Sequence, residues 1–505
     1  MLSLIIFFPA LAAMLGFLID EKSIKVYGVC IAFIEFLLTL FMWFSFSGVS
    51  QEFSLINHIS LIGFLNVNYT VGVDGISLFL VILSSFTTLI GLISLNLKGN
   101  LKHLIISILF LEMTMMGVFL ALDAILFYIF WELSLLPMLY IIGAWGSGNR
   151  IYAAIKFFIY TFFGSVFMLV AILAMAYLHY KINGIWSFSI VDWQNLKLPL
   201  NTQIWLFLAF FIAFAVKTPM FPFHTWLPYA HGQAPTIGSV LLAAVLLKMG
   251  TYGFVRFSLP MFPDASVELF NIVAILAIVM VIYTALIAYA QDDMKQVIAY
   301  SSISHMGVIV LGIFAMNVEG ISGAIFMMIS HGVVSGALFL LVGIIYERRH
   351  TKMIGEFGGL ASVMPKYALV FCVIMLGSIG LPLTIGFVGE FLSLVGIFKA
   401  NFIYAILGGI GIIVGAIYML NLFRKVFYGV CDKEENLELK DLNLRELITL
   451  VPLCLLVIYL GVSPNIMLKP IDMSVNQMMV KMYNKSLKSE TKEFIANSNR
   501  IGGGQ

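Results

Sequence analysis

Ionisable residues inside apolar stretches are the part of this sequence that could do chemistry. Lys217 lies in the run FFIAFAVKTPMFPF, shortly before Pro219 and Pro222. A lysine at the centre of a membrane helix is disfavoured by about 2.5–3.5 kcal/mol on insertion scales, and each proline interrupts the helical hydrogen bonds. Lipid cannot satisfy the freed backbone groups, so this break must face protein or water. Because a desolvated ammonium is less stable as a cation, we interpret Lys217 as a proton carrier at a broken helix.

Glu132 and Lys248 are two further ionisable residues in apolar runs. Glu132, in FYIFWELSLLP, has no solvated loop near it, and Lys248, in LLAAVLLKMG, lies well inside its run. An acid near Lys217 would keep the lysine protonated, and separating the two would release the proton, so such a pair titrates as a unit. The alternatives are a packing role for Glu132 and, for Lys248, a side chain that reaches the interface.

A second helix break, Gly380-Leu381-Pro382, precedes Glu390. Glu390 corresponds in position to the lysine of the first break, and a carboxyl group can also carry a proton. His305 and His331 could pass protons to Glu390 from the second buried lysine, because imidazole titrates near neutral pH and can both donate and accept. The alternatives are a carboxylate that caps the broken helix and histidines that are only hydrogen-bonded.

Several other polar residues are consistent with either a functional or a structural role. Glu35 and Glu112 lie within apolar runs, and His224 and His231 lie at the expected inward mouth. Arg256 closes an apolar run, and we expect it to anchor that run at the lipid headgroups. We expect the following residues to be solvated: Asp123, Asp292, Asp293 and Lys295.

Composition identifies a polytopic membrane protein. The chain has 505 residues, of which 61% are hydrophobic and 11% charged, and its net charge of +2 gives no indication of nucleic-acid binding. The four cysteines show no CxxC spacing, so no iron–sulfur or zinc pattern follows. Neither GxGxxG nor a Walker loop occurs, and we therefore expect no cofactor in this chain.

The apolar runs predict an all-α fold with about 14 transmembrane helices, each needing roughly 20 residues to cross the hydrocarbon. Lys and Arg concentrate in the loops that lie inside if the N-terminus is outside, and this predicts the orientation. The polar, Lys-rich tail predicts a surface helix followed by disorder. The runs lie near 2–18, 26–46, 76–96, 102–121, 123–143, 152–179, 203–224, 236–257, 267–290, 296–316, 321–346, 366–398, 402–428 and 445–463.

The two matching breaks predict two inverted repeats of five helices each. They fall in the seventh and twelfth runs, and an odd number of spans per repeat inverts the second copy in the membrane. Paired broken helices are the best sequence indication of a transport pathway. We expect the segments 1–101 (helices one to three), 102–257 (repeat one), 267–428 (repeat two), 429–463 (linker and last helix) and 464–505 (polar tail).

Four motifs resemble one known family. WELSLLPM, VKTPMFPFHTWLPYAHGQAPTIGSVLLAAVLLK, DDMKQVIAYSSISHMG and GFVGEF are similar to the antiporter-like membrane subunits of respiratory complex I, and the likeness covers about 105–430. The glutamate at position 390 makes the chain resemble the M-type subunits, mitochondrial chain 4 included, which have glutamate at this position. The L- and N-type relatives and the multisubunit cation/proton antiporters have lysine there.

The resemblance implies a non-redox, proton-translocating subunit of NADH-quinone oxidoreductase in the inner membrane of a bacterium. NAD, FMN, iron–sulfur clusters and quinone would belong to partner subunits, and L-type and N-type subunits would be neighbours. Two alternatives remain: a subunit of a sodium/proton antiporter or membrane-bound hydrogenase, and a passive structural subunit. The proton path that the resemblance implies consists of Glu132, Lys217, Lys248, His305, His331 and Glu390.

Overall fold

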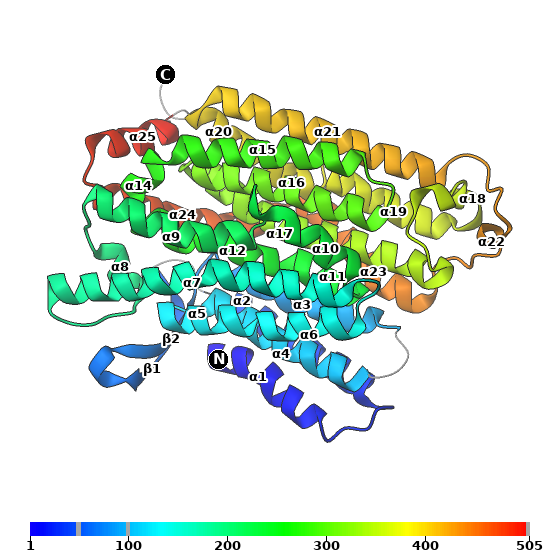
Figure 1. The fold of residues 1–505 in the computed structure, drawn as a ribbon, viewed down its shortest axis with the longest axis horizontal. Coiled ribbons are helices and arrows are strands. Elements are labelled where there is room, and N and C mark those ends of the chain that lie inside the picture. The colour runs from blue at the N-terminus through cyan, green and yellow to red at the C-terminus, as the bar shows by residue number, and fades with distance from the viewer. Residues whose placement is uncertain (47–51, 97–100, 501–505) are drawn as a thin grey trace.

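The computed structural model describes residues 1–46, 52–96 and 101–500, and in this part of the chain it is an almost entirely helical bundle (Figure 1). Eleven helical segments are long and apolar enough to cross a membrane, and three shorter apolar helices bring the number to the 14 expected. The 11 are α2 (Ile24–Phe44), α4 (Leu101–Leu120), α5–α6 (Ala124–Trp145), α7 (Arg150–Asn183), α9 (Leu200–Lys217), α11–α13 (Thr236–Met261), α15 (Phe270–Tyr289), α16 (Met294–Phe314), α17 (Val318–Arg349), α21 (Phe402–Phe427) and α23 (Leu444–Val462), and the shorter three are α1 (Leu2–Gly16), α3 (Leu78–Ser94) and α19 (Pro365–Ser378).

Two spans form the centre of the bundle, in which the helices run side by side along the long axis (Figure 1). The most apolar stretches of α11–α13 and α17 are wholly buried, whereas those of α2, α21 and α23 are about one-third buried or less. An apolar helix that is exposed on most of its surface is stable only against lipid, so α2, α21 and α23 lie at the periphery.

Both predicted helix breaks are confirmed. Helix α9 ends at Lys217 and the chain resumes as α10 (Trp226–Gln233), while α19 ends at Ser378 and resumes as α20 (Ile385–Ala400). Each break contains a proline, which removes one backbone donor and disfavours helical geometry in the residue before it. The inverted-repeat relation between the two halves stays a prediction.

Polar side chains begin several helices, and one of them corrects an expectation. Asp123 is buried rather than solvated, and its carboxylate accepts hydrogen bonds from the backbone N–H groups of Ile125 and Leu126 at the start of α5. Asp293 begins α16 and Asn317 begins α17 in the same way. These caps satisfy N–H groups that have no partner within the helix.

The segment 52–75 and the end of the tail contain structure that the sequence did not predict, whereas the helix expected in the tail is present. Strands β1 (Ser54–Ile62) and β2 (Val67–Val73) form an antiparallel hairpin. The tail forms α24 (Asn465–Lys485), which has a buried apolar face, and α25 (Ser489–Arg500) where disorder was expected; residues 501–505 lie outside the described part. The remaining helices are α8 (Ile190–Asn195), α14 (Pro263–Glu268), α18 (Leu360–Val363) and α22 (Glu434–Leu437).

Arg256 is buried in the bundle, so its expected position among headgroups is wrong. Its Nη2 lies 2.8 Å from Oδ1 of Asp74, and its Nε donates to the Tyr252 hydroxyl at 3.0 Å. Arg256 is 4% exposed and Asp74 3%. The pair joins the loop before α3 to the π-helical turn Phe254–Ser258, and each buried charge is stabilised by the other.

Asp74→Asn is expected to destabilise the fold by about 3–5 kcal/mol, because it leaves the Arg256 charge buried without a counter-ion. The measurement is the thermal unfolding midpoint of the detergent-purified protein. Glu268→Gln, which breaks an ion pair to Lys488 between half-exposed side chains, is the control and should leave the midpoint unchanged. Equal midpoints for Asp74→Asn and the unaltered protein would contradict the assignment.

Candidate functional site: a chain of buried ionisable groups

The break after Lys217 is closed by hydrogen bonds from within the protein. The indole N–H of Trp226 donates to the carbonyl of Val216 at 2.9 Å, and the backbone N–H of Met220 donates to the carbonyl of Ala215 at 2.7 Å. These bonds replace the helical donors that Pro219 and Pro222 interrupt. The lysine therefore lies at a fixed helix end that is enclosed by protein.

Lys217 and Glu132 do not form a direct ion pair in this structure. Lys217 is buried, and its Nζ has no hydrogen-bond partner among the described residues; Oε1 of Glu132 is also unpartnered. The ammonium lies over the rings of Trp131 and Phe157, with 5.4 and 5.6 Å between Nζ and the ring centroids. Glu132 still acts electrostatically on Lys217, so the two are separated neighbours.

Thr218, the residue after Lys217, packs against the helix that contains Lys248. Its buried hydroxyl is so close to Gly250 that a Cβ on that glycine would lie 2.3 Å from Oγ1. This contact packs the end of α9 against α12 (Leu247–Gly253), the helix that contains Lys248. Thr218 follows Lys217 by one residue and Gly250 follows Lys248 by two, so the two lysines lie on helices that pack together here. The Thr218 hydroxyl has no hydrogen-bond partner among the described residues.

Lys248 makes the closest contact of the chain of groups. Its Nζ lies 2.6 Å from Nδ1 of His331, and it also donates to the carbonyl of Ala243. Ala243 belongs to a π-helical turn, Leu242–Leu246, in which the wider backbone hydrogen bonding departs from the α-helical pattern. Such turns are frequent at functional sites. Lys248 is 0% exposed, so these two partners replace its hydration.

His305 and Glu390 complete the chain of groups on the far side of His331. The two imidazole rings are 5.7 Å apart between centroids, and Nδ1 of His305 lies 3.1 Å from Oε1 of Glu390. A cavity of about 20 Å³ is lined by both histidines, by Glu390 and by Ser301 and Ser330 among others. This volume is enough for one water molecule with several polar partners.

Glu390 depends on the second break for its position. Gly380 has a φ of +70°, and a Cβ at this residue would lie 2.2 Å from Oε2 of Glu390. Only glycine satisfies both conditions, because other residues rarely adopt this φ and any Cβ would collide with the carboxylate. The break Gly380-Leu381-Pro382 therefore opens the space that the carboxylate fills.

Lys295 is a buried group whose burial the sequence analysis missed. It was expected in a solvated turn, but its ammonium is enclosed and donates to the carbonyl of Ala234 at 2.6 Å. His231 is fully buried, stacks on Phe339 at 4.5 Å between centroids, and is acted on electrostatically by both Lys295 and Lys248. The signal for Lys295 was its place in the first turn of α16, which packs on α10.

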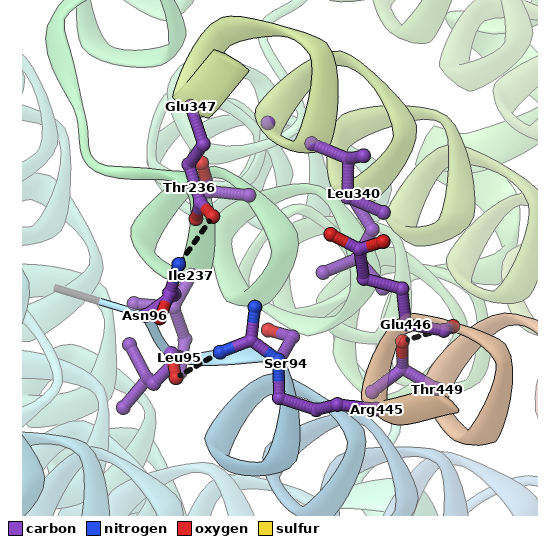
Figure 2. Close-up of a pocket in the computed structure, with 12 residues that line it drawn as sticks. Ser94, Leu95, Asn96, Thr236, Ile237, Leu340, Glu347, Arg445, Glu446 and Thr449 are labelled. Carbon is purple, nitrogen blue, oxygen red and sulfur yellow. Dashed lines mark hydrogen bonds between the residues drawn. The ribbon is translucent and has the colours of Figure 1, made fainter. Parts of the chain in front are cut away.

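A second polar pocket lies apart from these groups, at the ends of α3 and α17 and the starts of α11 and α23 (Figure 2). Asn96 donates to the carboxylate of Glu347 at 3.0 Å, and Arg445 donates to the carbonyl of Leu95 at 3.2 Å. None of the six residues of the predicted path lines it, so we do not assign it to the path.

The structure therefore places the predicted residues in a definite order. Lys248, His331, His305 and Glu390 follow one another through α12, α17, α16 and α20. Lys217 ends α9, which packs through Thr218 on the helix of Lys248, but its ammonium has no hydrogen bond to Glu132 or to the series among the described residues. Such a series of titratable side chains enclosed in apolar helices can hold and pass protons.

Comparisons with known proteins identify the family of this chain. The family described as NADH:quinone oxidoreductase/Mrp antiporter, transmembrane, matches residues 121–415. Subunit M of NADH-quinone oxidoreductase from Rickettsia bellii (strain RML369-C) is 44% identical over 492 residues, which are 95% of this chain and 99% of that one.

Two solved structures have the same fold. A chain of respiratory complex I from Thermus thermophilus, with bound NADH, is 31% identical with a TM-score of 0.88 and covers 95% of this chain and 100% of its own. A chain of the Mrp complex from Dietzia sp. DQ12-45-1b has a TM-score of 0.83 and covers 99% of each chain, but at 17% identity it shows the fold alone. The chain therefore belongs to the NADH:quinone oxidoreductase/Mrp antiporter transmembrane family and, within it, to the subunit M group of NADH-quinone oxidoreductase.

Proposed function

We propose that this multi-pass membrane protein translocates protons as a non-redox subunit of NADH-quinone oxidoreductase, through Glu132, Lys217, Lys248, His331, His305 and Glu390. The observation that carries the proposal is the contact series from Lys248 to Glu390, in which each group faces the next across a different helix. Its support from relatives is the similarity to subunit M over nearly the whole chain.

The separated positions of Glu132 and Lys217 suit the proton-releasing state of such a pair. When the carboxylate approaches, it stabilises the ammonium, and when it withdraws, the ammonium is left in an apolar site and gives up its proton more readily. The released proton would pass to Lys248, and the two imidazoles would carry it onward, with one water bridging the rings in the cavity between them.

The assembly around this chain follows from the same family. We propose that NAD, FMN, iron–sulfur clusters and quinone are bound by partner subunits, and that L-type and N-type antiporter-like subunits flank this one. The membrane would be the inner membrane of a bacterium, with the N-terminus outside, as the distribution of Lys and Arg favours. The segments 102–257 and 267–428 would be the two inverted repeats.

Lys217→Ala is expected to reduce both proton translocation and coupled quinone reduction more than about tenfold. A tenfold loss of rate corresponds to an increase of ~1.4 kcal/mol in the activation free energy. Lys217→Arg should fail equally, because a guanidinium does not release its proton in proteins. The measurement is proton uptake and quinone reduction by the assembled complex in vesicles, with assembly checked on native gels. Lys181→Ala, an exposed lysine at the end of α7, is the control that should keep full activity.

Full coupled activity in Lys217→Ala, in a normally assembled complex, would leave only the passive structural role. The same vesicles discriminate the antiporter alternative. Proton uptake should be unchanged when sodium is replaced by potassium, and a strict sodium requirement would favour the alternative.

His331→Gln is expected to lower coupled proton translocation by about tenfold or more, since the amide can still hydrogen-bond Lys248 but cannot titrate. His179→Gln is the matched control: His179 is also largely buried, in α7, and only bonds to the carbonyl of Ile185 at 2.8 Å. Unchanged translocation in His331→Gln would show that this imidazole does not carry protons.

A further inference from the structure

Two carboxyl groups outside the proposed path are fully enclosed in the N-terminal helices. Glu35 lies in the middle of α2 and Glu112 in the middle of α4, and both side chains are 0% exposed. All four of their carboxyl oxygens lack a hydrogen-bond partner among the described residues. Buried polar groups are nearly always hydrogen-bonded, so this arrangement requires an explanation.

The register of the two helices places the carboxyls opposite each other. Helices α2 and α4 contact each other and are separated along the chain by the single span α3, so they run parallel. Gly28 of α2 packs on Ile105 of α4, where a Cβ would lie 2.6 Å from Cγ2. Glu35 and Glu112 each follow these contact residues by two helical turns, and residues so spaced share a helix face.

Within the residues that the structure describes, neither carboxyl is paired with a cation. Neither carboxyl has an ion-pair or hydrogen-bond partner in the described part of the chain, and the charged group that acts on Glu112 is Glu35. The Thr39 hydroxyl of α2 is hydrogen-bonded to Ser85 of α3 at 2.7 Å, and the Thr114 hydroxyl of α4 donates to the carbonyl of Leu111 at 2.7 Å. Two carboxylates facing each other in this environment cannot both be ionised.

We propose that Glu35 and Glu112 form a proton-binding carboxyl pair, separate from the path between Lys217 and Glu390. A protonated carboxyl at one residue donates its O–H to a carboxylate oxygen of the other, which provides both groups with their missing partner and leaves at most one negative charge. The ligand of this site is therefore a proton, held between two transmembrane helices.

The protonation state is tested by infrared spectroscopy of the assembled complex at pH 8, as a difference between unaltered protein and Glu35→Gln with Glu112→Gln. The difference should contain the C=O band of a protonated carboxylic acid. The control is Glu319→Gln, which removes a carboxylate paired to Lys399 at the protein surface and should lose only carboxylate bands. A difference with carboxylate bands alone for the double variant would overturn the proposal.

The facing geometry is tested by charge exchange, with the amount of assembled complex as the readout. In Glu112→Lys the new ammonium would meet the Glu35 carboxylate, so assembly should be retained. Adding Glu35→Leu leaves that ammonium unpaired, and assembled complex should fall by about tenfold or more. Equal assembly with and without Glu35→Leu would show that the two side chains do not face each other. Neither readout depends on proton translocation, so the outcome is independent of the proposed path.

Discussion

The ammonium of Lys248, in the middle of a wholly buried helix, is the constraint on which the structure depends. A charge in this position is stable only if protein atoms replace its hydration. The π-helical turn before it supplies the carbonyl of Ala243, and α17 supplies the imidazole of His331. The two helices that provide these groups are the two most buried spans of the bundle. The outer helices form an apolar layer between this polar centre and lipid.

The helix breaks follow from the same constraint. A broken helix exposes backbone N–H and C=O groups that lipid cannot satisfy. Each break is therefore enclosed by protein, which can supply the missing hydrogen bonds. At the first break the indole N–H of Trp226 donates a hydrogen bond to the carbonyl of Val216. At the second break Gly380, which has no side chain, leaves space for the carboxylate of Glu390. The breaks thereby place ionisable groups at fixed depths beside the central helices. Geometry of this kind gives a proton a defined sequence of acceptors.

Much of this could be predicted from the sequence because the energetic cost of burying charge is large. The apolar runs gave the number of spans, and the ionisable residues inside them gave the candidate path, with prolines marking both breaks. The order of His331 before His305 could not be predicted, because spacing along the chain does not determine which helix faces meet. The π-helical turn Leu242–Leu246 could not be predicted either, because its residues are apolar and typical of an ordinary transmembrane helix.

Two of the errors arose where the partner of a residue is remote in the chain. Arg256 at the end of a span normally lies at an interface, and only the fold brings Asp74 to it. Lys295 follows two aspartates and therefore resembled part of a solvated turn, but the packing of α16 on α10 encloses it. In the tail one helix was expected and α24 is present, but the second helix, α25, was missed because its apolar residues are few and widely spaced among polar ones.

A density map of the assembled complex at a resolution that shows water tests the account most directly. The account predicts an ordered water in the cavity between His305 and His331, within hydrogen-bond reach of both, and water or a polar side chain between Lys217 and Lys248. A dry gap at either place, or a Lys217 ammonium directed at acyl chains, would contradict a continuous proton path.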